Sequence, residues 1–427
     1  MSERRVKVAR RAEVPPFAVM DIIAEANRRR AAGRPVLNMC AGEPATGASD
    51  VVRERASAIL ASGQLGYTEA LGAPALRAEI AAHYLRWYDV ELDPARVAVT
   101  TGSSGGFMLA FLAAFDVGDR VVLARPGYPA YRNVLAALGC EVVEIDCGPE
   151  VRYQPTVALL EALEEPVDGL VVASPANPTG TMIEAAELAA LAEWCAAHGV
   201  RLVSDEIYHG ITYGPPTTAP RGVWGSGSPT PAPAAGGESA SPGGTGSGWR
   251  ESAPTAARFL DQGAIVVNSF SKFWAMTGWR LGWLVLPDDL LAPVDALAGN
   301  VALCPPALAQ DAAIAAFSEE GYAAAHANVA RYAVARELVL SRLDELGWHQ
   351  VAPADGAFYV YADISSSGLD SREWCARLLA EADVALTPGT DFDPAHGHDW
   401  VRLSFASDAA VVGEALDRIV AWQERLA

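Results

Sequence analysis

Short apolar runs alternate with helical stretches between about residue 96 and residue 287, and this alternation restricts the fold more than any other feature of the chain. The apolar runs are rich in valine, whereas the stretches between them are rich in Ala and Leu, with apolar positions at helical spacing. Such alternation is typical of an α/β fold, in which helices cover both faces of a mostly parallel sheet. Seven strands are predicted, at 96–101, 120–124, 141–145, 169–173, 201–204, 264–268 and 281–286, with helices at 105–115, 131–138 and 184–198 among them.

A second, smaller α+β domain is predicted after the sheet, because 427 residues are too many for one core and long Ala-rich helices replace the alternation. The expected division is an N-terminal segment (1–50) that joins the small domain, a large domain (51–300) and the small domain (301–427). Within the small domain we expect helices at 308–317, 323–346 and 371–382, a strand pair at 349–352 and 357–363, a run at 402–405 and a terminal helix.

Residues 214–254 depart from this pattern, since Gly, Ser, Pro, Thr and Ala dominate them. Such a composition buries too little apolar area to offset the entropy of ordering. We therefore predict a flexible surface insertion, with a substrate lid as the alternative interpretation.

Charge and cysteine content exclude several classes of partner. The net charge is -20, with 52 acidic and 32 basic residues, which argues against nucleic acid. No apolar stretch is long enough to span a membrane, and the basic N-terminus lacks the apolar segment of a secretory signal. Six cysteines without a CxxC pair predict free thiols and no metal site. We expect a cytoplasmic protein.

One lysine lies in a setting that indicates its chemistry. Lys272 follows an apolar run, where loss of hydration favours the neutral amine that can attack a carbonyl group. Ser269, Ser271 and Arg280 surround it with the donors that a phosphate prefers. Together these residues indicate pyridoxal phosphate held as a Schiff base. The alternative is a surface lysine beside a structural arginine.

The glycine- and serine-rich segment 100–106 follows a predicted strand and opens a helix. Its backbone N–H groups, around Ser103 and Ser104, would form an anion site at the helix N-terminus. An ordinary strand-to-helix turn would look the same in sequence. With Arg280, however, the segment supplies the second side of a phosphate site.

Two polar residues close buried strands. Asn177 lies in the turn 174–180, where two prolines and a glycine would hold its amide at the edge of the sheet, although an ordinary turn asparagine is the alternative. Asp205 ends the strand at 201–204, where an unpaired carboxylate would be costly. A protonated pyridine nitrogen would be a suitable partner and would make the ring an electron sink. A salt bridge or a helix cap is the alternative for Asp205.

These motifs, in this order and at these spacings, resemble the class I aminotransferases of the aspartate aminotransferase superfamily, which belong to the class I/II pyridoxal phosphate enzymes of fold type I. The resemblance extends from about Asn38 to the C-terminus, interrupted only by the insertion. It rests on four motifs: Asn-Pro-x-Gly at 177–180, Ser-Asp-Glu-x-Tyr at 204–208, Ser-x-Ser-Lys at 269–272 and Gly-Trp-Arg-x-Gly at 278–282.

The resemblance implies roles for individual residues. Lys272 would form the Schiff base and move the proton between the substrate Cα and the cofactor C4′ atom. Asp205 would keep the ring nitrogen protonated, Tyr208 and Asn177 would bond to the 3-oxygen, and Tyr128 would stack on the ring. The phosphate would be held by Ser103, Ser104, Ser269 with Ser271 beside it, Arg280, and Tyr67 from the partner subunit of a homodimer.

The same resemblance implies how substrate binds. Arg402 would grip the α-carboxylate through a bidentate pair, and Gly42 would add a backbone N–H. The implied activity is ping-pong transfer of an amino group from an L-amino acid to a 2-oxo acid. Some aspartate-specific relatives carry a lysine in the phosphate loop, and 103–106 has none, so we predict a neutral donor such as alanine, valine or an aromatic amino acid.

Three alternative functions stay open at this point. Aspartate aminotransferase activity is one, and a pyridoxal phosphate-dependent C–S β-lyase on the same fold is another, since a leaving group at Cβ can divert the reaction. A non-enzymatic cofactor sensor would need a DNA-binding segment, and the roughly 35 residues before the resemblance begins are few for such a segment.

Overall fold

The computed structural model describes residues 6–40, 42–214 and 251–426. Its main feature is a seven-stranded sheet in the order β2-β8-β7-β6-β5-β3-β4, in which β8 runs antiparallel to both neighbours and the other pairs are parallel. The predicted strands are confirmed to within one residue at each end. They are β2 (Val97–Thr100), β3 (Arg120–Arg125), β4 (Glu141–Asp146), β5 (Gly169–Ala173), β6 (Arg201–Asp205), β7 (Ile265–Ser269) and β8 (Gly282–Val285).

Helices cover both faces of this sheet, because successive strand residues point to opposite sides and both sides are apolar. Leu170 and Val171 of β5, for example, are buried in two different core clusters. Each fully buried valine or leucine stabilises the fold by about 1.5–3 kcal/mol. Among the helices that contribute to the two clusters are α3 (Pro74–Tyr88) and α7 (Ala185–His198) on one face, and α4 (Gly102–Ala114), α5 (Pro129–Leu138) and α8 (Asp288–Val301) on the other.

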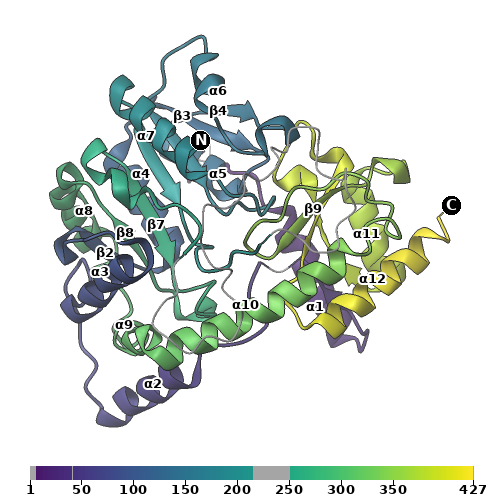
Figure 1. The fold of residues 1–427 in the computed structure, drawn as a ribbon, viewed down its shortest axis with the longest axis horizontal. Coiled ribbons are helices and arrows are strands. Elements are labelled where there is room, and N and C mark those ends of the chain that lie inside the picture. Colours follow the sequence, from purple (N-terminus) through teal and green to yellow (C-terminus); the bar gives the residue numbers. More distant parts are fainter. Residues whose placement is uncertain (1–5, 41, 215–250, 427) are drawn as a thin grey trace, which may run out of the picture.

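The C-terminal part of the chain forms a separate three-stranded antiparallel sheet in the order β11-β12-β9. Figure 1 shows α1, from the start of the chain, beside these C-terminal elements, and β1 pairs with β10 in parallel. The long α10 runs from below the large sheet to this region. The elements are α1 (Ala18–Ala31), β1 (Leu37–Asn38), α9 (Ala307–Ile314), α10 (Glu319–Leu340), β9 (Tyr359–Asp363), α11 (Ser371–Ala382), β10 (Val384–Ala385), β11 (Thr387–Pro388), β12 (Trp400–Ser404) and α12 (Ala409–Gln423). The exact domain limits stay a prediction.

The segment predicted as a strand at 349–352 does pair with β9, through hydrogen bonds of 2.9 Å from the Ala352 N–H to the Tyr361 carbonyl and from the Asp363 N–H to the Gln350 carbonyl, but it does not form a full strand. Val351 makes only an isolated antiparallel bridge with Ala362. Pro353 follows at once, and a proline has no N–H with which to extend a ladder. In the part of the chain that the structure describes, no helix is long and apolar enough to cross a membrane. All six cysteines are free, as predicted.

Most of the predicted insertion, 215–250, lies outside the described residues. Its last four residues are described, and three of them are at least partly buried, which the prediction of a solvated loop did not anticipate. The Glu251 carboxylate accepts hydrogen bonds from the backbone N–H of Gly210 and, at 3.1 Å, from the Thr212 hydroxyl, and Ala253 is 1% exposed. A carboxylate that finds several donors can be buried, which composition alone does not reveal.

The described ends of this insertion lie close together, because the Ser252 hydroxyl donates to Thr212 Oγ1 at 2.9 Å. We therefore expect a protein in which a short Gly/Ser link replaces 215–250 to fold, to bind cofactor and to keep turnover within about tenfold, since closure entropy changes slowly with loop length. Cofactor absorbance and steady-state rates test this, with a Gly/Ser segment of the native length as control. Loss of turnover in both proteins, with folding and cofactor binding retained, would show that this stretch is a substrate lid or a partner contact.

Candidate active site

The predicted site residues converge at one edge of the large sheet. Asp205 is the last residue of β6, Ser269 is the last residue of β7, and Asn177 follows β5. These three strands are neighbours and run parallel, so their carboxyl ends meet at the same edge. Residues from both ends of the chain, Gly42 and Arg402, complete the cluster.

Lys272 follows β7 and reaches into this cluster. Its Nζ donates a hydrogen bond of 2.5 Å to the Gly42 carbonyl and lies 5.8 Å from the centroid of the Tyr208 ring. Burial, together with the charge of Arg402, lowers the pKa of the Lys272 amine to about 8. A larger fraction of the amine is therefore neutral near pH 7 than for an ordinary lysine, whose pKa is about 10.4. A neutral amine is the form that attacks a carbonyl group.

Asp205 is a buried carboxylate, 4% exposed. Oδ1 accepts the backbone N–H of Ile207 at 3.1 Å, and Oδ2 accepts the hydroxyl of Tyr131. Burial raises the pKa of Asp205 to about 6, while the Tyr131 and Ile207 hydrogen bonds and the charge of Lys272 oppose that shift. Asp205 is thus mostly ionised at neutral pH, and a cationic ring nitrogen would suit it.

Arg402 on β12 is a buried cation, 4% exposed. Nη1 donates to Asn177 Oδ1 at 2.7 Å, and Nη2 donates to the Cys40 carbonyl at 2.7 Å. The guanidinium lies 4.4 Å from the centroid of the Tyr359 ring and 4.8 Å from that of Phe392.

The charge of Arg402 has no anionic partner within the described residues, and its Nε atom lacks a hydrogen bond. A buried charge without a counter-ion is costly. The arrangement therefore suits an anion that arrives from outside, such as the carboxylate of a substrate.

The N-terminus of α4 and Arg280 face each other across the start of β8. A Cβ atom on Gly102, whose φ is +68°, would lie 2.5 Å from Arg280 Nη2, so this position needs glycine. Ser103 and Ser104 lie in the first turn of α4, where N–H groups have no partner within the helix. A guanidinium beside free N–H groups forms an anion site.

Two serines that precede Lys272, Ser269 and Ser271, bond to each other. The Ser269 hydroxyl donates to Ser271 Oγ at 2.9 Å and accepts the backbone N–H of Ser271 at 3.0 Å. These bonds keep both hydroxyls inside the protein, where water does not satisfy them. An incoming anion would find a donor there.

Three aromatic residues of the cluster were not identified from the sequence: Tyr131, Tyr359 and Phe392. Tyr359 shares a hydrogen bond of 2.7 Å with the Tyr208 hydroxyl, and Tyr131 packs edge-on against Tyr128 at 5.4 Å. A spacing of three residues puts Tyr128 and Tyr131 on one helical turn, and this signal could have identified Tyr131. Tyr67, in contrast, is 85% exposed.

The residues present fit pyridoxal 5′-phosphate. An amine of lowered pKa suits its aldehyde, the anion site suits its phosphate, and the buried Asp205 suits its ring nitrogen. The uncompensated charge of Arg402 lies in the same cluster as the amine. The site can therefore hold this cofactor together with a carboxylate-bearing substrate.

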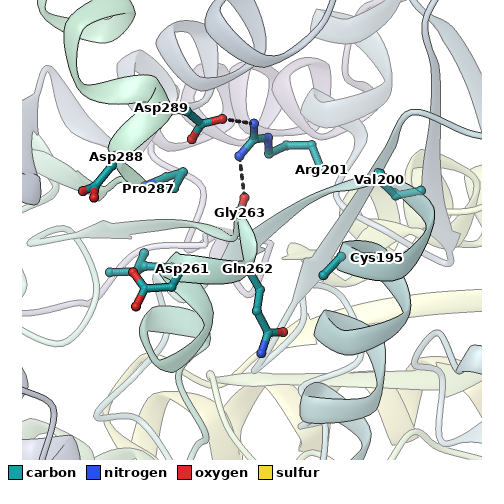
Figure 2. Close-up of a pocket in the computed structure, with 12 residues that line it drawn as sticks. Cys195, Val200, Arg201, Asp261, Gln262, Gly263, Pro287, Asp288 and Asp289 are labelled. Atoms are coloured by element: carbon teal, nitrogen blue, oxygen red, sulfur yellow. Dashed lines mark hydrogen bonds and ion pairs between the residues drawn. The ribbon is translucent and has the colours of Figure 1, made fainter.

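Another hollow, of about 560 Å³, lies at the opposite end of the same strands, next to Arg201 at the start of β6. Figure 2 shows Arg201 bonded to Asp289, at 2.6 Å, and to the Gly263 carbonyl, at 2.8 Å. The guanidinium of Arg201 is thus already paired. This hollow is therefore separate from the cluster around Lys272.

This fold and site define a class of protein, the pyridoxal phosphate-dependent enzymes of fold type I. More narrowly, the chain belongs to the class I and II aminotransferase family, whose sequence model matches residues 34–419. It is an aminotransferase that uses pyridoxal 5′-phosphate, which confirms the predicted fold, cofactor and enzyme class.

Relatives match over nearly the whole chain. The valine–pyruvate aminotransferase of Mycobacterium tuberculosis is 50% identical over 418 residues, which cover 97% of this chain and 98% of that protein. A crystal structure of an aminotransferase from the same organism superposes with a TM-score of 0.87 at 49% identity, covering 99% of this chain and 100% of the other. The Thermus thermophilus aspartate aminotransferase with maleate gives a TM-score of 0.84 at 29% identity, with the same coverage.

Proposed function

We propose that this aminotransferase takes a neutral L-amino acid as donor and that Arg402 binds its α-carboxylate. The observation that carries the proposal is the buried guanidinium of Arg402 without an anionic partner among the described residues, in one cluster with the Lys272 amine. A bidentate pair with a carboxylate would satisfy that charge. The relative named valine–pyruvate aminotransferase supports a neutral donor, because valine has no second carboxylate.

We infer the remaining roles from the same geometry. Arg280, Ser269 and the first turn of α4, with Ser103 and Ser104, would hold the phosphate. When bound, the cofactor supplies an aldehyde for the amino group and a ring that accepts electrons from the substrate Cα. Ser271, beside Ser269, would support this phosphate site.

Lys272 would carry protons in both half-reactions. With a pKa near 8, a substantial fraction of its amine is neutral and can accept the Cα proton. The amine is also basic enough to hold that proton until it is transferred to the cofactor C4′ atom. Asp205 would hold a proton on the ring nitrogen, which strengthens the electron demand of the ring. Tyr208 and Asn177 would donate to the 3-oxygen, and Tyr128 would cover one face of the ring.

A homodimer is part of the proposal, because Tyr67 is predicted to reach the phosphate of the partner subunit. Large apolar side chains after α2 (Asp50–Ser62) and at the end of α8 are exposed, among them Leu65, Tyr67, Val301 and Leu303. The two segments are neighbours, since a Cβ on Gly299 would lie 3.8 Å from the Cβ of Ala70. An exposed apolar surface of this kind marks a protein interface.

The donor preference is tested by mixing the cofactor-loaded enzyme with each of the twenty amino acids and recording loss of the cofactor absorbance. We expect alanine, valine or an aromatic amino acid to react faster than aspartate, with pyruvate or 2-oxoglutarate as acceptor. Arg402 and Arg280 are the cations whose charges lower the pKa of Lys272. Arg402 is assigned to the substrate α-carboxylate and Arg280 to the cofactor phosphate, so neither is left for a second carboxylate on the substrate. Aspartate as the best donor by about tenfold, or 1.4 kcal/mol, would contradict the proposal. Release of pyruvate and a thiol from cysteine conjugates would indicate the β-lyase alternative.

A further inference from the structure

Tyr131 of α5 contacts the carboxylate to which the ring nitrogen is assigned. Its hydroxyl donates to Asp205 Oδ2, and the side chain is buried, with 7% exposed. Asp205 Oδ1 is occupied by the N–H of Ile207. Among the described residues, Tyr131 is thus the one side chain that donates to this carboxylate.

The surroundings of Tyr131 keep its phenol protonated, so that the hydroxyl can donate a hydrogen bond. Burial and the neighbouring negative charge of Asp205 raise the pKa of the phenol well above its ordinary value. A phenol that retains its proton can donate it to a carboxylate, and a hydrogen bond to the charged form of an acid stabilises that form. The hydrogen bond therefore favours the charged form of Asp205.

Tyr131 also belongs to the same helical turn as Tyr128. The Tyr131 N–H donates to the Tyr128 carbonyl at 3.3 Å, and the two rings meet edge-on at 79°. Phe107 of α4 packs against the other side of Tyr131 at 5.0 Å. These contacts fix the hydroxyl in position and connect it to the residue proposed to cover the cofactor ring.

We propose that Tyr131 is a positioning residue that keeps Asp205 ionised and oriented toward the cofactor's ring nitrogen. The proposal rests on the role proposed above for Asp205. One proton is shared between that nitrogen and the carboxylate, and whichever group binds it more strongly holds it. By stabilising the charged carboxylate, Tyr131 leaves the proton on nitrogen. Without this donor, the proton moves toward the Asp205 oxygen.

The test is the position of that proton, measured by nitrogen NMR on enzyme loaded with cofactor that carries ¹⁵N in its ring. Tyr131→Phe removes only the hydroxyl. We expect its ring-nitrogen resonance to move from the protonated toward the neutral position, and turnover to fall by about tenfold or more, as for loss of a hydrogen bond to a charged group. Tyr332→Phe, at a buried tyrosine of α10, is the matched control and should leave both readouts unchanged.

Two further variants guard against a purely structural effect. Tyr131→His restores an N–H donor, and the resonance should return toward the wild-type position. In an Asp205→Asn background, Tyr131→Phe should cause no additional shift, because there is no carboxylate left to stabilise.

The outcomes separate the two proposals. A protonated resonance in wild type that Tyr131→Phe leaves in place would overturn the role of Tyr131 alone, as would identical resonances in Tyr131→Phe and Tyr131→His. A neutral ring nitrogen in the wild-type enzyme would overturn the role of Asp205, and that of Tyr131 with it.

Discussion

Lys272→Ala is expected to abolish covalent attachment of the cofactor and to remove the bulk of turnover. The amine that would form the Schiff base and the group that would move the Cα proton are the same atom, so one substitution removes both. Loss of a positioned acid–base group alone costs about 10²–10⁴-fold in rate. The measurement is borohydride reduction followed by mass spectrometry of the labelled peptide, together with the steady-state rate.

The composition of this chain makes that experiment unusually clear. It has only two lysines, Lys7 and Lys272, so a reduced cofactor adduct has one other amino-acid side chain to label. Lys7 is exposed, and Lys7→Ala should retain both the adduct and the activity of wild type. A Lys272→Ala protein that transaminates at a rate comparable with wild type would refute the assignment of this residue.

Asp205→Asn is expected to keep the cofactor bound but to slow removal of the Cα proton. The neutral amide can no longer stabilise a protonated ring nitrogen by charge, and loss of a charge-assisted bond in a buried site costs about 3 kcal/mol, or roughly hundreds-fold in rate. The checks are cofactor absorbance for binding and the deuterium isotope effect at Cα for the slowed step.

Glu206 provides a matched control for this experiment, because it is the next residue, is fully buried and belongs to no proposed role. Its carboxyl accepts the Ala256 N–H at 2.7 Å and the Thr255 hydroxyl at 2.8 Å, and burial raises its pKa to about 8. It is therefore mostly neutral at pH 7, and Glu206→Gln should keep turnover within about tenfold. Wild-type turnover in Asp205→Asn, or an equal loss in both variants, would show that Asp205 is structural.

The strands of the large sheet and the residues that end them could be predicted from local sequence patterns. Strand positions follow from side-chain patterning within a few residues, which is local information. Asp205 and Lys272 could be assigned because each follows an apolar run whose burial makes a charged group costly without a partner. Where composition was the sole guide, as at 251–254, or where a proline follows the pattern, as at 349–352, the prediction was only partly right.

Contacts between residues that lie far apart in the chain could not be predicted in this way and are seen in the folded structure alone. Arg402 bonds to Asn177 across 225 positions, and Lys272 bonds to Gly42 across 230. Tyr131 reaches Asp205 because α5 packs against the face of the sheet to which Val203 of β6 contributes, and the spacing of Tyr131 from Tyr128 does not predict that contact with Asp205. Side-chain patterns report which face of an element is buried, whereas the partner of a buried hydroxyl or guanidinium depends on how whole elements pack, which local sequence does not contain.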